Sequence, residues 1–193
     1  LALATLVGMP LIAIIVDHYS DEQVNLAASV AGPMPVIKQM LYGLLAGVAS
    51  AGAAYALISA KFMRHISSHY TAILGHFNLA WHEILLISLC AGVGEELLFR
   101  GAIQPFLGIA LTSILFVGIH GYYSFRSWQI SIYGATMTII IAAIGWMAIT
   151  CGLISAIVAH TIIDVVLLHR MQVDAQRNNI PPAFGPDDVN QPT

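Results

Sequence analysis

Ionisable side chains lie inside apolar stretches of this sequence, where a membrane-spanning helix would have to bury them. In the segment GVGEELLFRG they are Glu95, Glu96 and Arg100. Each such group costs about 2.5–3.5 kcal/mol at the centre of a membrane helix. Because a helix turns about 100° per residue, Glu96 and Arg100 share a face and Glu95 points about a quarter-turn away. We therefore expect Glu96 and Arg100 to pair, which leaves Glu95 without a local cation as a candidate general base for activating water.

Two later apolar stretches carry polar groups with the same spacing. FVGIH places Phe116 and His120 on one helix face, and HTIID places His160 and Asp164 on one face. The simplest way to keep these groups out of lipid is to turn all three helices toward one interior cavity. The sequence therefore predicts that Glu95, His120, His160 and Asp164 converge in a catalytic site.

Other interpretations of the same residues remain open at this stage. Two imidazoles and two carboxylates could also bind zinc, iron or manganese, with Glu95, His120, His160 and Asp164 as ligands. A single membrane histidine such as His120 often serves only as a hydrogen-bond donor between helices, and the Glu96–Arg100 pair could be purely structural. Four such groups on three helices are, however, expensive to retain for packing alone, which favours a site.

The composition requires that these groups be positioned by membrane helices. Of the 193 residues, 58% are hydrophobic and only 9% are charged, and the mean hydropathy is +0.81, whereas soluble domains carry about 25% charged residues. In lipid each apolar run must be a helix. We expect an all-α polytopic bundle of about six membrane helices and one interfacial amphipathic helix. The apolar runs are residues 1–16, 36–60, 84–106, 107–123, 128–149 and 152–168.

The remaining segments are assigned by their polarity. Residues 17–35 read as a polar loop, and aromatic and aliphatic residues spaced three and four apart predict an amphipathic interfacial helix over 61–81. There, His65 and His69 are four residues apart, a spacing more typical of a solvated helix face than of a metal site. We expect one transmembrane domain over residues 1–169, with its catalytic core at 84–169, and a polar, disordered tail over 170–193.

The charge pattern excludes one class of partner. The net charge is −3, with only seven Lys and Arg residues along the chain, so no basic stripe could follow a phosphate backbone and we expect no nucleic-acid partner. Cys90 and Cys151 both lie in apolar runs, so neither a disulfide framework nor a cysteine zinc site is indicated. The expected partners are the lipid bilayer and a substrate that reaches the site within it.

Taken together and in order, the three motifs resemble a known family. E-E-x-x-x-R at Glu95, Glu96 and Arg100, F-x-x-x-H ending at His120, and H-x-x-x-D at His160 and Asp164 are similar to the CAAX protease and bacteriocin-processing family of intramembrane endopeptidases, which includes the type II CAAX prenyl endopeptidases. The similarity covers about residues 84–169. Each motif alone is weak, but the set of three is specific.

The resemblance implies roles for these residues in cleaving a peptide or protein substrate at the membrane. It implies that Glu95 and His120 activate water, that Glu96 and Arg100 support the site, and that His160 and residue 164 stabilise the oxyanion or orient the substrate. Many members have Asn where this chain has Asp164, and an ionised carboxylate cannot donate to an oxyanion. Asp164 is therefore protonated, orients His160, or ligates a metal such as zinc. We expect no required cofactor, since a Glu–His pair activates water unaided.

Two further function classes fit the same residues. A proton- or ion-coupled transporter also uses buried carboxylates and histidines, although discontinuous helices and inverted repeats, which would favour it, are not evident in the sequence. A non-catalytic membrane protein of the bacteriocin-immunity type would keep the motifs as a ligand cavity. The small size and the distribution of the resembled family favour a bacterial inner membrane as the location.

Overall fold

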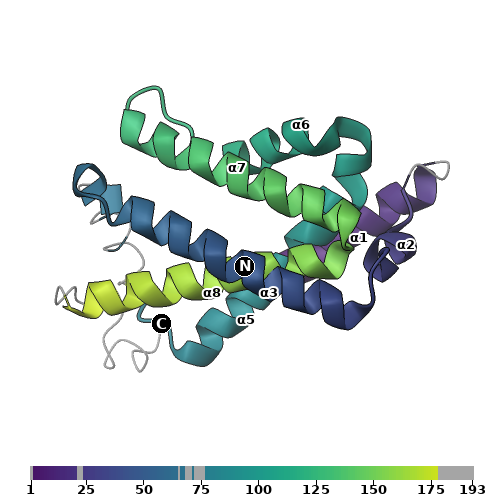
Figure 1. Cartoon of the computed structure of the whole chain (residues 1–193), viewed down its shortest axis with the longest axis horizontal. Helices are drawn as coiled ribbons and strands as arrows, with labels where there is room; N and C mark the ends of the chain where they lie inside the picture. The colour runs from purple at the N-terminus through teal and green to yellow at the C-terminus, as the bar shows by residue number, and fades with distance from the viewer. Residues whose placement is uncertain (1, 21–23, 65, 68–70, 72–76, 178–193) are drawn as a thin grey trace, which may run out of the picture.

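The described part of the chain is built from helices and short connections. The computed structural model describes residues 2–20, 24–64, 66–67, 71 and 77–177, and in these residues there is no β-strand. The predicted all-α class is thereby confirmed (Figure 1). Five helical segments are long and apolar enough to cross a bilayer: α1 (Ala2–Tyr19), α3 (Val36–Ile58), the segment Trp81–Ile119, α7 (Trp128–Thr150) and α8 (Leu153–Arg177).

The segment Trp81–Ile119 combines two of the six expected helices. Its 39 residues would measure about 58 Å as a straight helix, nearly twice the hydrocarbon thickness. The segment instead comprises α5 (Trp81–Glu96), the π-helix η2 (Leu97–Ile103) and α6 (Gln104–Ile119). Gly108, with φ 70° and ψ 173°, interrupts α6 in a conformation that favours glycine. The kink turns α6 back so that it runs beside α7 (Figure 1).

The π-helix lies where the sequence weakens the regular hydrogen-bond ladder. Pro105, at the start of α6, has no N–H to donate to the carbonyl four residues earlier, which belongs to Gly101. The chain widens at this point, and Arg100 lies inside the widened stretch. Single turns of π-helix inside α-helices occur frequently at functional sites.

Helices α3 and α8 pack closely because glycines line their contact. A Cβ atom added at Gly43 would lie 2.5 Å from the carbonyl oxygen of Ser155, and one at Gly47 would lie 2.8 Å from that of Ala159. Small residues four positions apart let two backbones approach closely. Figure 1 shows α3 and α8 side by side. This contact fixes the stretch of α8 that carries His160.

Helices α7 and α8 form a tight hairpin. Helix α7 ends at Thr150 and α8 begins at Leu153, and Gly152 makes the turn with φ +124°. The buried side chain of Gln39 on α3 donates to the carbonyls of Ala31 and Met34 at 2.8 and 2.9 Å. These bonds fix the start of α3 next to the turn.

Three connecting segments differ from the sequence prediction. The predicted loop 17–35 contains a short helix, α2 (Leu26–Ala31), because the Asn25 side chain caps the N–H of Ala28 at 2.8 Å. The predicted tail starts later, because α8 continues to Arg177 with Gln172 and Ala175 buried. The predicted interfacial helix begins as a 3₁₀ turn, η1 (Lys61–Met63). Most of that predicted helix, with His65 and His69, and residues 178–193 of the tail lie outside the described residues.

The outer surface of the bundle suits a bilayer. Large apolar side chains stand exposed along the spans, among them Leu3 at 69%, Ile37 at 73% and Ile139 at 72%. In water such a surface would be unfavourable, whereas lipid tails solvate it. Together with the five apolar helical segments, it makes the chain an integral, multi-pass membrane protein.

Candidate active site

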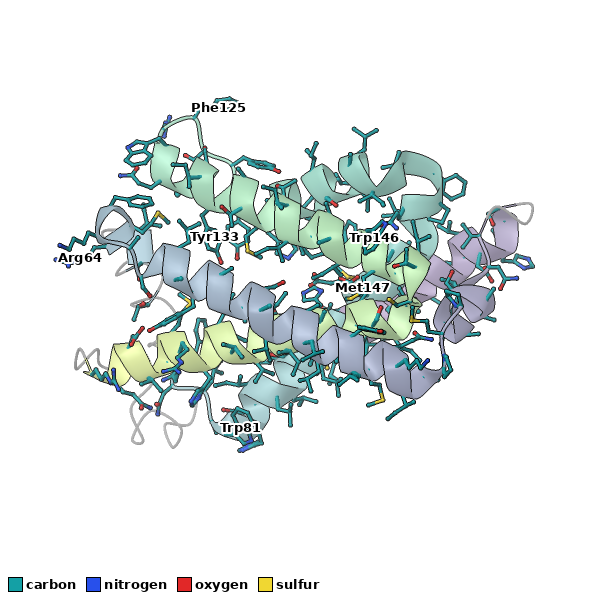
Figure 2. All side chains as sticks on the ribbon, in the orientation of Figure 1. Arg64, Trp81, Phe125, Tyr133, Trp146 and Met147 are labelled. Carbon is teal, nitrogen blue, oxygen red and sulfur yellow. The ribbon has the colours of Figure 1, made fainter. Side chains whose placement is uncertain are left out.

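A cavity of about 400 Å³ lies inside the bundle, and four of the six predicted site residues lie together at one part of its wall. Apolar side chains of α3, α7 and α8 form most of the remaining wall, and Tyr133 points from α7 toward α3 (Figure 2). The carboxylates and imidazoles on this wall belong to α5, to the end of α6 and to α8: Glu95, His120, His160 and Asp164. The structure therefore brings together the four side chains that the sequence placed on three helices.

Glu95 lies between the two imidazoles. Its Oε2 atom is 3.5 Å from Nε2 of His120 and 4.0 Å from Nε2 of His160. This oxygen is buried and has no hydrogen-bond partner among the described residues. A buried acceptor without a partner is costly, so the cavity contains a carboxylate oxygen that needs a donor.

His160 connects the cavity to the buried ion pair behind it. Its Nδ1 lies 2.7 Å from Oε1 of Glu96, and its Nε2 lies 3.6 Å from Oδ2 of Asp164. An ionised carboxylate only accepts, so Nδ1–H of His160 donates to Glu96. Glu96 therefore fixes the ring orientation and leaves Nε2 facing the cavity.

Arg100 and Glu96 form the ion pair that their spacing predicted. Nε of Arg100 lies 3.2 Å from Oε2 of Glu96, and both side chains are fully buried. The guanidinium carbon lies 4.7 Å from the centre of the Phe116 ring, which adds a cation–π contact. Burying Glu96 without this cation would be very unfavourable.

His120 follows the last residue of the apolar span, Ile119, and is partly exposed. Its Nδ1 lies 2.7 Å from the carbonyl oxygen of Phe116. Because a carbonyl only accepts, Nδ1 carries the hydrogen and Nε2 faces Glu95. Burial disfavours the charged ring, but the neighbouring Glu95 carboxylate and the Phe116 carbonyl outweigh burial, so the pKa of His120 is raised above its usual 6.5.

The residues do not have the arrangement of a preformed metal centre. In the part of the chain that the structure describes, no three or more His, Cys, Asp or Glu side chains are placed to hold a metal ion. Zinc binding by Glu95, His120, His160 and Asp164 therefore stays a prediction, which metal analysis of the purified protein tests.

The sequence did not predict several residues around the site. The Tyr122 ring lies 6.1 Å from His120 and nearly parallel to it, with an interplanar angle of 17°. Met63 and Ile66, from the segment expected to lie at the membrane surface, line the cavity instead. Neither feature follows a helical spacing rule, because both depend on how loops pack against distant helices. The adjacency of Tyr122 to His120 in the sequence was the only signal for the first.

The chain thus belongs to the class of membrane helical bundles with an acid–imidazole site buried inside. Within this class, residues 77–166 match the model of the family described as type II CAAX prenyl endopeptidase Rce1-like. No curated protein and no solved structure matches the chain. The match confirms the resemblance that the three motifs indicated, and the matched segment contains all six predicted site residues.

Proposed function

We propose that this chain is an intramembrane endopeptidase that hydrolyses a peptide bond of a membrane-associated or C-terminal peptide. The family match supports intramembrane endopeptidase activity at the family level. The observation that carries the finer proposal is the buried Oε2 of Glu95, which has no hydrogen-bond partner among the described residues and faces Nε2 of His120 across 3.5 Å. Water bound there would meet an acceptor in a mostly apolar cavity.

In this proposal Glu95 is the general base and His120 orients the water. The Glu95 carboxylate takes a proton from the water while the water oxygen attacks the scissile carbonyl carbon. The carbonyl π electrons move to its oxygen, which becomes an oxyanion. Glu95 then returns the proton to the amide nitrogen as the C–N bond breaks, so atoms and charge balance.

His160 and Asp164 act on the oxyanion side. When protonated, His160 offers its Nε2–H to the cavity, because Nδ1–H is already donated to Glu96 at 2.7 Å. A donor fixed before the reaction stabilises developing charge without reorganising. Asp164, with Oδ2 at 3.6 Å from Nε2 of His160, orients that ring. Glu96 and Arg100 support the ring from behind and do not touch the substrate.

We also propose that the reaction needs no cofactor, and we propose a substrate class and a location. The Glu95–His120 pair works without a metal, and metal analysis of the purified protein would check this. The matching family is described as prenyl endopeptidases, so a farnesylated C-terminal peptide is the first substrate to test. A bacterial inner membrane is the proposed location.

The deciding experiment compares two glutamates of α5 in liposomes. The substrate is a farnesylated peptide carrying a fluorophore and a quencher, beside its unprenylated form. We expect Glu95→Gln to abolish cleavage while the protein remains folded. Glu83→Gln is the matched control: Glu83 lies at the start of the same helix, where its side chain accepts from the Ala80 N–H at 2.7 Å, a bond that glutamine retains.

The other function classes give different results in the same preparation. Wild-type turnover in Glu95→Gln would refute the proposed mechanism. Proton flux into the liposomes that is lost on changing Glu95 or Asp164 would identify a transporter. Full biological activity with both Glu95 and His120 replaced by Ala would identify a non-catalytic protein.

A further inference from the structure

His120 lies where α6 has ended, so the helix alone does not hold its ring. Gly121 follows it with φ +75° and turns the chain out of the helix. Besides its bond to the Phe116 carbonyl, the imidazole packs against two aromatic rings. Phe116 lies 4.5 Å away at an interplanar angle of 27°, and Tyr122 lies 6.1 Å away at 17°. Phe116 belongs to the F-x-x-x-H motif, whereas Tyr122 lies outside every motif.

Tyr122 is itself held by α7. Its ring meets the buried ring of Tyr133 edge-on, with centroids 5.2 Å apart. Its carbonyl oxygen lies so close to α7 that a Cβ atom added at Gly134 would be 2.0 Å from it. Only glycine at position 134 permits this approach.

Other residues of the loop between α6 and α7 are hydrogen-bonded to α7 as well. The hydroxyl of Ser131 donates to the Ser124 carbonyl at 2.8 Å and accepts from the Ser124 N–H at 3.3 Å. The hydroxyls of Tyr123 and Thr138 lie 2.5 Å apart. Helix α7 carries none of the three motifs. The loop that follows His120 is nevertheless hydrogen-bonded to the first turns of α7.

We propose that Tyr122 is a positioning residue for His120, pressed against the imidazole by the contact of its backbone with Gly134. The proposal rests on the proposed function, in which Nε2 of His120 must face the water held by Glu95. Tyr122 limits the rotation of the ring, and α7 sets the position of Tyr122. A misplacement of about 1 Å can cost about 100-fold in rate.

The first test replaces Tyr122 and measures hydrolysis in liposomes. We expect Tyr122→Leu to lower kcat about 10-fold or more with KM within about two-fold, because the flat ring beside His120 is lost while an apolar side chain still lines the cavity. Tyr122→Phe keeps the ring and should restore kcat. Phe125→Leu is the matched control, since Phe125 belongs to the same loop but is fully exposed and points away from the bundle (Figure 2). An equal loss of kcat in Phe125→Leu, or none in Tyr122→Leu, would overturn the proposal.

The second test moves Tyr122 without changing it. Gly134→Ala adds a methyl group against the Tyr122 carbonyl, and we expect it to lower kcat as Tyr122→Leu does. Gly52→Ala is the control, because Gly52 is also helical and has nothing within 4 Å of an added Cβ. If Gly134→Ala has the same kcat as Gly52→Ala, α7 does not position His120.

A third measurement separates this proposal from the proposed function. Hydrogen–deuterium exchange at the imidazole C2 position, read by mass spectrometry as a function of pH, reports the environment of each histidine without any substrate. We expect the exchange profile of His120 to shift in Tyr122→Leu and Gly134→Ala, while that of the exposed His169 does not. This result holds even if the wild-type protein cleaves no peptide. An unchanged His120 profile in both variants would overturn the positioning role.

Discussion

The Nδ1 atom of His160 lies 2.7 Å from Oε1 of Glu96, and the other oxygen of that carboxylate lies 3.2 Å from Nε of Arg100. One carboxylate thus accepts from an imidazole in the cavity wall and neutralises a buried guanidinium behind it. Its neighbour Glu95 faces the cavity and pairs with no arginine within 4.0 Å among the described residues. Two adjacent glutamates therefore have different surroundings, and the proposed mechanism assigns Glu96 mainly to stability and Glu95 to the reaction.

The first prediction separates these roles. Glu96→Gln leaves Arg100 buried without a counter-charge, and breaking a buried pair in this way typically costs about 3–5 kcal/mol of stability. We expect a large fall in the thermal unfolding temperature of the protein in detergent, together with lost activity as His160 loses its acceptor. Glu95→Gln should lose activity with little change in that temperature. Equal unfolding temperatures for Glu96→Gln and the wild type would contradict this assignment.

Local spacing was enough to predict much of the site. Glu96 with Arg100, and His160 with Asp164, are four residues apart, and in a helix that spacing alone places two side chains within reach. The cost of burying these groups in lipid then predicted that they would face one cavity. Both relationships follow from the helix repeat and from the membrane as solvent, which the sequence alone indicates.

The four-residue spacing could not predict contacts between segments that are distant in the sequence. The bond from His160 to Glu96 depends on how α5 packs against α8, and the ring of Tyr122 depends on Gly134 of another helix. The π-helix Leu97–Ile103 had only weak local signals, chiefly Pro105. The sequence did not predict the extension of α8 to Arg177, because the residues there are polar. They are helical because part of this stretch packs against the rest of the protein, where Gln172 is buried.

The second prediction concerns the pH dependence of stability. The pKa of His120 is raised in the folded protein, so the stability that comes from its protonation is fully present below about pH 6.5 and is lost as the pH rises through the folded value. His120→Gln removes this contribution. We expect the gap in unfolding temperature between wild type and His120→Gln to be widest below about pH 6.5 and to narrow at alkaline pH.

The measurement is a series of thermal unfolding curves of both proteins over that pH range in one detergent. Since every other titrating group is common to the two proteins, their difference reports His120 together with the charges that interact with it. A gap that widens toward alkaline pH would mean that the folded protein favours the neutral ring, and the contact with Glu95 would then have been assigned the wrong sign.

The last prediction addresses position 164, where this chain departs from the Asn found in many proteins of the resembled family. Oδ2 of Asp164 lies 3.6 Å from Nε2 of His160, and its side chain is 29% exposed to the cavity. Asparagine has the same shape and keeps an acceptor oxygen for the His160 ring while adding an N–H donor. We therefore expect Asp164→Asn to keep kcat within about three-fold of wild type, and Asp164→Ala to lower it about 10- to 1,000-fold, as the loss of a group that stabilises the transition state does.

The comparison of the two variants distinguishes shape from charge. If Asp164→Asn is as inactive as Asp164→Ala, the negative charge itself is required, either to stabilise a protonated His160 or to bind a metal. Metal analysis of the wild type and Asp164→Asn then decides between these two roles, because only a ligand role predicts about one ion per chain that the asparagine variant loses. If Asp164→Asn exceeds the wild type, the added donor N–H acts on the oxyanion, and in the wild-type chain that stabilisation falls mainly to His160.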